Sequence, residues 1–144
     1  MIVARPTFVV ADLPGLIEGA HQGKGLGIQF LRHIERTRVL VFLIECTADD
    51  PRGSYEALLH ELTSFNKALG RKPRIVAISK MDTADDDMRK KVAGLSFGRG
   101  VQVIPISSVS GDGLDELVEE IWKRLAKSGE HRSERKAKKT AEAV

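Results

Sequence analysis

The chain has 144 residues, 42% hydrophobic and 30% charged, which are the proportions of one soluble globular domain and exclude a largely disordered or fibrous chain. Cys46 is the only cysteine, so neither an internal disulfide nor a cysteine metal cluster can form, as is typical of a reducing compartment. The sequence has no apolar run of the roughly 20 residues that a membrane span needs, and its start lacks the pattern of a secretion signal. We therefore expect a cytoplasmic protein.

The 23 basic and 20 acidic side chains give a net charge of +3, which is too small to indicate a nucleic-acid binder by itself. Residues 128–144 contain five basic and three acidic side chains and no apolar residue larger than alanine before Val144. This composition predicts one domain over residues 1–127, followed by a basic, disordered tail that would carry most of the attraction for polyanions.

In the N-terminal half, two apolar runs of strand length flank a glycine-rich segment. Residues 7–11 are apolar and β-branched and end in turn residues, which predicts a buried strand followed by a loop. Five glycines over residues 15–27 argue against regular structure there. Apolar residues with helical spacing then predict a helix over residues 26–37, and the apolar run 39–44 predicts a strand that is covered on both faces.

The middle of the chain has one clear helical pattern and one strand. Apolar side chains at three- and four-residue intervals predict a helix over residues 55–69. Gly70 occupies the place where a left-handed C-cap would end this helix. The apolar, β-branched run 74–78 predicts the next strand.

Two helices and a strand complete the pattern. A short helix is predicted over residues 88–95, with Thr83 and Asp86 as its N-terminal cap. Residues 101–106 predict a strand, and an apolar stripe predicts a last helix over residues 114–127, with acidic residues in its first turn and basic residues in its last.

Four strands alternating with four helices predict an open α/β fold, in which a mostly parallel sheet has helices on both faces. In such sheets, ligands bind beyond the carboxyl ends of the strands. This rule selects four segments of the chain, which are residues 12–15, the residues from Glu45 onward, residues 79–82 and residues 107–111.

The first segment, Asp12-Leu13-Pro14-Gly15, has residue types that suit a phosphate and a magnesium ion. A carboxylate directly after a buried strand can hold magnesium through water, and a glycine three residues later can turn its N–H toward a terminal phosphate. Taken alone, the tetrapeptide fits a tight turn after a strand equally well.

The segment Ser79-Lys80-Met81-Asp82 follows a predicted strand and suits a purine base. The carboxylate of Asp82 matches a base edge with two adjacent donors, which guanine presents, and the stem of Lys80 could lie along the purine face. Taken alone, these residues fit a solvated lysine and a turn-forming aspartate better.

The segment that begins Ser107-Ser108-Val109 follows the last predicted strand. Its small residues allow backbone N–H groups to approach a carbonyl acceptor closely, although the segment alone is only a polar loop. Taken together, the three segments indicate a ligand-binding site much more strongly than any one of them does. The reason is that all three fall at strand ends and follow one another in one order along the chain.

At these positions the sequence resembles the GTP-binding domain of the Obg family of translation-factor-class GTPases. Residues 12–20 match the family's Asp-x-x-Gly switch segment, and residues 25–37 are similar to the Obg switch helix almost letter for letter. Residues 79–82 resemble the guanine-specificity motif, and residues 107–111 resemble the last base-binding loop. The resemblance covers about residues 6–127.

The resemblance implies a G domain of the P-loop NTPase class that binds GTP and GDP. It implies that Asp12 and Gly15 act in hydrolysis and that Asp12 holds magnesium through water. The nucleotide-binding residues that it implies are Asp12, Leu13, Pro14, Gly15, Ser79, Lys80, Met81, Asp82, Ser107, Ser108 and Val109. It also implies a monomeric cytoplasmic protein whose partner is the large ribosomal subunit or its rRNA during subunit assembly.

Leu16, within the matching segment, stands where GTPases that orient the attacking water with a glutamine often place it, which implies slow hydrolysis. The sequence departs from the family pattern in two ways. Ser79 stands where the guanine motif normally begins with asparagine. No Gly-x-x-x-x-Gly-Lys-Ser/Thr motif occurs in the chain. We therefore interpret the chain as the C-terminal part of an Obg GTP-binding domain, without the phosphate-binding loop and inactive by itself.

Two other functions compete with this interpretation. One is a non-catalytic α/β module that binds RNA or the ribosome through the basic residues 123–139. The other is a phosphoacceptor receiver domain that uses Asp12, Lys80 and Ser107, although the acidic cluster that such domains need is not evident. Glu45 is assigned to capping and solvation rather than to catalysis.

Overall fold

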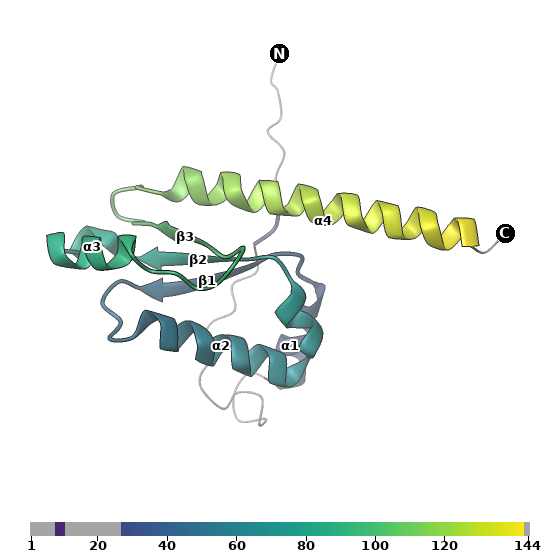
Figure 1. Ribbon diagram of the computed structural model, residues 1–144, viewed down its shortest axis with the longest axis horizontal. Coiled ribbons are helices and arrows are strands. Elements are labelled where there is room, and N and C mark those ends of the chain that lie inside the picture. Colours follow the sequence, from purple (N-terminus) through teal and green to yellow (C-terminus); the bar gives the residue numbers. More distant parts are fainter. Residues whose placement is uncertain (1–7, 11–26, 143–144) are drawn as a thin grey trace, which may run out of the picture.

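The computed structural model describes residues 8–10 and 27–142. Within this part of the chain, three parallel strands form one sheet in the order β1-β2-β3, as Figure 1 shows. The strands are β1 (Leu40–Glu45), β2 (Arg74–Ser79) and β3 (Gln102–Pro105). The helices are α1 (Gly27–Arg36), α2 (Pro51–Phe65), η2 (Lys67–Arg71), η3 (Met81–Thr83), α3 (Asp86–Ala93) and α4 (Leu114–Glu142), of which η2 and η3 are short 3-10 helices.

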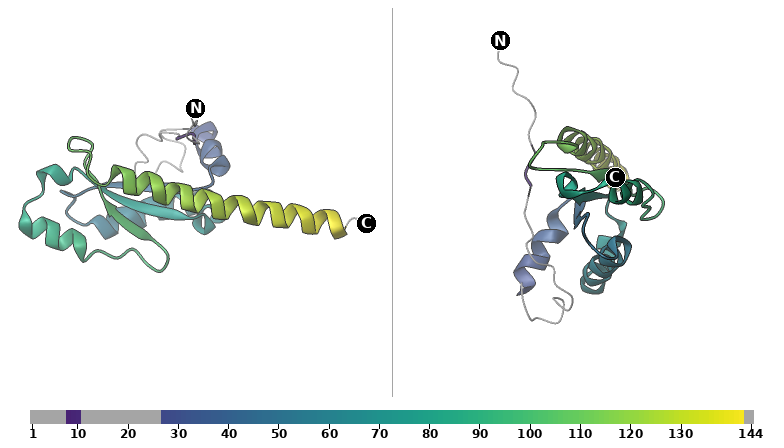
Figure 2. Two further views of the ribbon diagram at one scale, coloured as in Figure 1. Left: turned by 90° about the horizontal axis from the view of Figure 1, so that it is seen from above. Right: turned by 90° about the vertical axis from the view of Figure 1, so that its left-hand side faces the viewer.

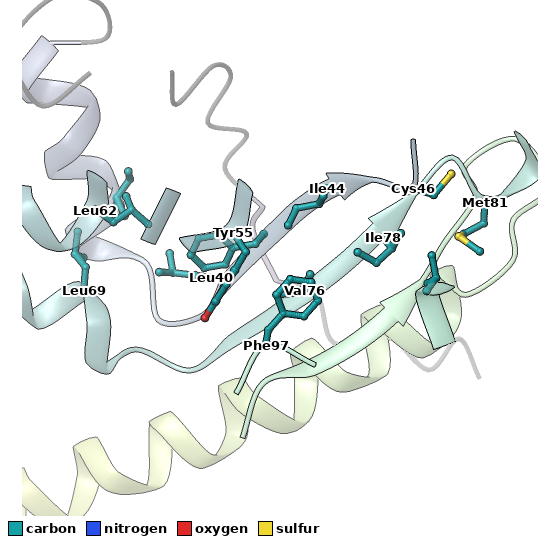
Figure 3. Packing of buried hydrophobic residues seen from close by; sticks show 13 residues of the cluster. Leu40, Ile44, Cys46, Tyr55, Leu62, Leu69, Val76, Ile78, Met81 and Phe97 are labelled. Atoms are coloured by element: carbon teal, nitrogen blue, oxygen red, sulfur yellow. The ribbon is translucent and has the colours of Figure 1, made fainter. Parts of the chain in front are cut away.

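The sheet separates two apolar layers. The larger layer joins β1 and β2 to α1, α2 and the segment around Phe97, and Figure 3 shows part of it. The smaller layer joins the opposite face of β2 and β3 to α4 and includes Ile75, Ala77 and Ile104. Both faces of β2 are therefore fully buried, as expected of a central parallel strand. The predicted α/β class, with a parallel sheet and helices on both faces, is confirmed.

The strand β1 is covered on one face only, in contrast to the prediction for residues 39–44. Leu40, Phe42 and Ile44 are buried against the helices α1 and α2. Val41 and Leu43 alternate with them and are 39% and 61% exposed. The reason is that α4 packs over β2 and β3, and β1 is the edge strand of the sheet that the structure describes.

The strand predicted over residues 7–11 is not found in its described part. Phe8, Val9 and Val10 have no regular structure, and Val9 and Val10 are 98% and 73% exposed. The Phe8 ring instead packs edge-on against the ring of Trp122 on α4, with a centroid separation of 5.1 Å. A β-branched run forms a strand only where a neighbouring strand pairs with it, and no described strand lies beside these residues.

The helix α2 ends before the position that the apolar spacing predicts. Asn66 is its C-cap, with an extended backbone, and the side-chain oxygen of Asn66 accepts a hydrogen bond from the Ala68 N–H at the start of η2. Leu69 is still buried because η2 continues the apolar side of the helix. The prediction that Gly70 is a left-handed C-cap is wrong, because Gly70 lies inside η2.

The cap of α3 also differs from the prediction. Asp85 is the N-cap residue, and its carboxylate accepts a hydrogen bond of 2.8 Å from the Met88 N–H. The hydroxyl of Thr83 instead donates to the carbonyl oxygen of Lys80 at 2.8 Å. Thr83 therefore stabilises the loop after β2 and takes no part in capping the helix.

The last helix is much longer than predicted. α4 begins at Leu114 as expected but continues to Glu142, so residues 128–142 are helical instead of forming a disordered tail. The alanine, lysine, arginine and glutamate residues of this segment have high helix propensity, which does not depend on an apolar stripe. Figures 1 and 2 show that this part of α4 extends well beyond the sheet. None of the described helices is both long enough and apolar enough to span a membrane.

Candidate functional site

The loops that follow β2 and β3 are joined by backbone hydrogen bonds. The Ile106 N–H donates to the carbonyl of Ile78 at 2.8 Å, and the Met81 N–H donates to the carbonyl of Ile106 at 3.2 Å. These bonds continue the pairing of two neighbouring parallel strands beyond their ends. Two of the segments selected from the sequence, residues 79–82 and residues 107–111, therefore form one site.

A side-chain hydrogen bond links the two segments at the centre of this site. The hydroxyl of Ser107 donates to Oδ1 of Asp82 at 2.9 Å. Ser107 is only 1% exposed, whereas Asp82 is exposed. The other carboxylate oxygen, Oδ2 of Asp82, has no hydrogen-bond partner within the described residues. The buried serine thus orients an accessible carboxylate that retains capacity to accept hydrogen bonds.

The loop after β3 curls around Ser107. The Gly111 N–H donates to the carbonyl of Ser107 at 2.8 Å, and the Ser110 N–H donates to its hydroxyl at 3.2 Å. The N–H groups of Ser108 and Val109, at the exposed tip, make no hydrogen bond in the part of the chain that the structure describes. These two donors are therefore open to an external carbonyl acceptor.

Gly113 allows this loop to turn close to the end of β3. Its φ is +75°, which L side chains rarely adopt, and a Cβ atom there would lie 2.1 Å from the carbonyl oxygen of Pro105. Only glycine fits this close approach. The position of the loop therefore depends on the residue type at position 113.

Lys80 has an unusual backbone conformation that several donors stabilise. Its φ and ψ are 59° and 33°, in the left-handed region, where a non-glycine residue is uncommon. Its carbonyl oxygen accepts hydrogen bonds from the hydroxyl of Thr83 at 2.8 Å and from Sγ of Cys46 at 3.2 Å. Cys46 comes directly after β1, so three strand ends contribute to the site.

The side chain of Lys80 makes an ion pair with the last residue of β1. Its Nζ lies 2.7 Å from Oε1 of Glu45, and both side chains are more than half exposed. The hydrogen bond with Lys80 and its positive charge lower the pKa of Glu45 below its ordinary value. The same contact with Glu45 raises the pKa of Lys80. Both groups are therefore charged at neutral pH.

Ser79 and Met81 contribute to the site in a different way. The hydroxyl of Ser79 donates to the carbonyl of Ile44 at 3.4 Å, and the carbonyl of Ser79 accepts from the Cys46 N–H at 3.0 Å. The side chain of Met81 is buried in the larger apolar layer, at the same end of the cluster as Cys46 (Figure 3). Both residues thus connect the loop to the sheet.

The strand-end rule selects the residues from Glu45 onward, but from the sequence Glu45 is assigned to capping and solvation and Cys46 has no role in the site. The predicted parallel pairing of the strands does contain information about the positions of these two residues. Glu45 is the register partner of Ser79, because β1 and β2 are parallel neighbours. A polar residue at the carboxyl end of β1 must therefore lie next to Lys80.

The segment Asp12-Leu13-Pro14-Gly15 lies outside the described residues. The magnesium and phosphate roles of Asp12 and Gly15 remain predictions from the sequence. The described segments 79–82 and 107–111 are those that the resemblance assigns to base recognition.

Comparisons with known proteins show the family to which the chain belongs. Residues 2–80, more than half of the chain, match the model of a family described as 50S ribosome-binding GTPase. The chain is 54% identical over 114 residues to GTPase Obg of Salinibacter ruber, an alignment that covers 77% of this chain and 34% of that protein. It is 50% identical over 124 residues to GTPase Obg of Desulfatibacillum aliphaticivorans, covering 84% of this chain and 37% of that protein. The chain spans about a third of the length of these curated relatives.

Proposed function

Because this chain belongs to the family of 50S ribosome-binding GTPases and is similar to GTPase Obg over most of its length, we propose that it forms the guanine-recognising part of a GTP-binding domain of the Obg type. One observation carries the proposal, which is the hydrogen bond of 2.9 Å by which buried Ser107 orients the exposed carboxylate of Asp82. This contact brings together the two segments that the resemblance assigns to base recognition.

The chemistry of guanine fits this arrangement. The ring N–H and the exocyclic amine of guanine are adjacent donors, and the Asp82 carboxylate accepts both of them. The guanine carbonyl accepts a hydrogen bond from the open N–H groups of Ser108 and Val109. Adenine presents neither the two adjacent donors nor a carbonyl, so the same groups discriminate against adenine.

Hydrolysis requires groups beyond this base site. Asp12 would hold magnesium through water, and the Gly15 N–H would contact the terminal phosphate, as the resemblance implies. A phosphate-binding loop, whose motif does not occur in the 144 residues, supplies the remaining donors and a lysine. The chain alone therefore binds GTP weakly and does not hydrolyse it, and Leu16 makes hydrolysis slow in a protein that has the loop.

The cellular role proposed for the whole protein rests on the resemblance found in the sequence and on the description of the matching family. We propose a cytoplasmic GTPase that acts on the large ribosomal subunit during its assembly. The description of the matching family, 50S ribosome-binding GTPase, supports the ribosomal partner.

The test is a titration of the ¹⁵N-labelled full chain, followed by NMR, with guanosine, adenosine and xanthosine monophosphates. A few base contacts, worth about 4 kcal/mol in total, correspond to a millimolar dissociation constant, which NMR detects. We expect guanosine monophosphate to shift the amide signals of Asp82, Ser108 and Val109, and the other two nucleotides to leave them in place. Equal shifts with guanosine and adenosine monophosphates would contradict the proposal.

A further inference from the structure

The end of β1 places a second carboxylate beside the base-recognition residues. Glu45 is the last residue of β1 and the register partner of Ser79, so its side chain lies next to Lys80. Its Oε1 is 2.7 Å from Nζ of Lys80, and its Oε2 accepts a hydrogen bond of 3.3 Å from the hydroxyl of Thr47. Thr47 thus helps to orient the carboxylate toward the lysine.

The backbone of Lys80 is held in place, so only its side chain can change partner. The carbonyl oxygen is fixed by the Thr83 hydroxyl and the Cys46 thiol, and the left-handed conformation forms the N-terminal end of η3. The hydrogen bond and negative charge of Glu45 and, to a smaller extent, the negative charge of Asp82 raise the pKa of Lys80. The observed ion pair is with Glu45.

The choice between these two carboxylates matters for base recognition. An ion pair between Lys80 and Asp82 would occupy the acceptor that guanine needs, and it would draw the lysine stem away from the purine face. In the structure, the ammonium group is bound by Glu45, on the side of β1. The carboxylate of Asp82 then keeps only the Ser107 hydroxyl as a hydrogen-bond partner within the described residues.

We propose that Glu45 is a positioning residue for guanine recognition, which holds the Lys80 ammonium group away from Asp82 and so leaves the Asp82 carboxylate open to the base. This inference rests on the proposed function of the site. It adds a role for Glu45 that lies outside the two base-binding segments.

The first arm of the test needs no nucleotide. The ¹³C signal of the Asp82 carboxylate is compared by NMR in the full chain and in its Glu45→Gln variant. Glutamine has nearly the same shape and can still accept a hydrogen bond, but it carries no charge and makes no ion pair with Lys80. Asp82 then becomes the charged partner that attracts the lysine, and we expect the Asp82 signal to move. Glu56→Gln is the matched control, because Glu56 also pairs with a basic side chain, Arg52, at similar exposure, but on the helix α2. An Asp82 signal that does not move in Glu45→Gln, or that moves equally in Glu56→Gln, would overturn the proposal.

The second arm measures guanosine monophosphate binding in a double-mutant cycle. Exposed ion pairs are worth little, so we expect Glu45→Gln to weaken binding only about two- to fivefold, with partial recovery in Glu45→Asp. In a Lys80→Gln background, Glu45→Gln should have no further effect, because there is no ammonium group to misplace. An undiminished effect of Glu45→Gln in that background would show that Glu45 does not act through Lys80.

The two arms separate this inference from the proposed function. If the wild-type chain does not prefer guanosine over adenosine monophosphate, the proposed function fails, and the Asp82 signal still decides whether Glu45 controls the partner of Lys80. If the wild-type chain prefers guanosine monophosphate and Glu45→Gln binds it equally well, only the positioning role fails.

Discussion

At the level of single residues, the proposed function assigns the choice of base to Asp82, whose carboxylate the Ser107 hydroxyl orients. Asp82→Asn places an amide N–H₂ opposite the donors of guanine, so we expect it to weaken guanosine monophosphate binding by roughly 1–3 kcal/mol, the cost of an unsatisfied polar group. Xanthine has a carbonyl where guanine has its amine. The same variant should therefore gain affinity for xanthosine monophosphate, which general misfolding cannot produce. Competition between guanosine and xanthosine monophosphates, measured on the wild-type chain and on Asp82→Asn, tests this change of preference. If the variant lost affinity equally for both nucleotides, Asp82 would be only a turn residue.

Gly113 provides a second residue-level prediction, which concerns the shape of the loop after β3. An alanine Cβ at position 113 would meet the Pro105 carbonyl oxygen, so Gly113→Ala should destabilise the fold by more than about 2 kcal/mol and abolish the response of Ser108 to guanosine monophosphate. Gly100→Ala is the control, because Gly100 has a φ of +78° and a Cβ atom there would meet nothing within 4 Å. It should cost only the backbone strain, about 1 kcal/mol. The free energy of unfolding is measured with urea for both variants. Equal losses in Gly113→Ala and Gly100→Ala would show that the closeness of the Pro105 carbonyl oxygen is not the reason why position 113 requires glycine.

At the level of elements, Lys72 connects the helix α1 to the start of β2. Its Nζ donates hydrogen bonds to the carbonyl oxygens of Ile34, Glu35 and Thr37, at the C-terminal end of α1, where a positive charge also complements the helix dipole. Partial burial lowers the pKa of Lys72, which offsets part of this gain.

Lys72→Met keeps most of the aliphatic stem and removes these hydrogen bonds. We expect a loss of roughly 1–2 kcal/mol in urea unfolding and faster amide hydrogen exchange in α1 than in α2. Lys67→Met, at an exposed lysine of η2, is the control and should change neither. Unchanged exchange in α1 after Lys72→Met would show that the apolar contacts of Ile34 suffice to hold the helix.

The C-terminal half of α4 is the element that separates the two candidate functions. The basic segment after residue 127 extends beyond the sheet, away from the loops that follow β2 and β3 (Figures 1 and 2). Deletion of residues 128–144 should therefore leave guanosine monophosphate binding unchanged. The same deletion should weaken binding to a single-stranded RNA oligonucleotide of mixed sequence, which for the full chain should fall steeply with salt. If the deletion abolished nucleotide binding and left RNA binding intact, the loops that follow β2 and β3 would not be the base site.

At the scale of the whole molecule, the sequence predicts the elements whose signal is local. The apolar runs at residues 39–44, 74–78 and 101–106 correspond to β1, β2 and β3 within a residue or two, because apolar, β-branched runs of this length favour strands. The run at residues 7–11 has the same composition, yet its described residues form no strand. Composition specifies that a segment can pair, whereas a neighbouring strand decides whether it does.

The details that the sequence did not predict depend on tertiary contacts or on competing local ones. The helical spacing of apolar residues passes through Asn66 into η2, so spacing alone cannot locate the end of α2. Thr83 and Asp85 are both good capping residues, and the contact between Thr83 and Lys80 decides between them. Glu45 joins the site only because parallel register places it beside Ser79. The segments 79–82 and 107–111 could be selected beforehand because both follow apolar runs of strand length.

The central claim is that this chain supplies the guanine-recognising part of an Obg-type GTP-binding domain. The most direct test is a chimera in which the chain replaces the matching segment of the Salinibacter ruber GTPase Obg, which is 54% identical over 114 residues. Circular dichroism first verifies that the chimera is folded, and isothermal titration then measures GTP and ATP binding with and without magnesium. We expect magnesium-dependent GTP binding by the chimera, at least about a hundredfold tighter than ATP binding, and only weak GTP binding by the chain alone. A folded chimera that bound GTP and ATP with equal affinity would contradict the proposed guanine recognition.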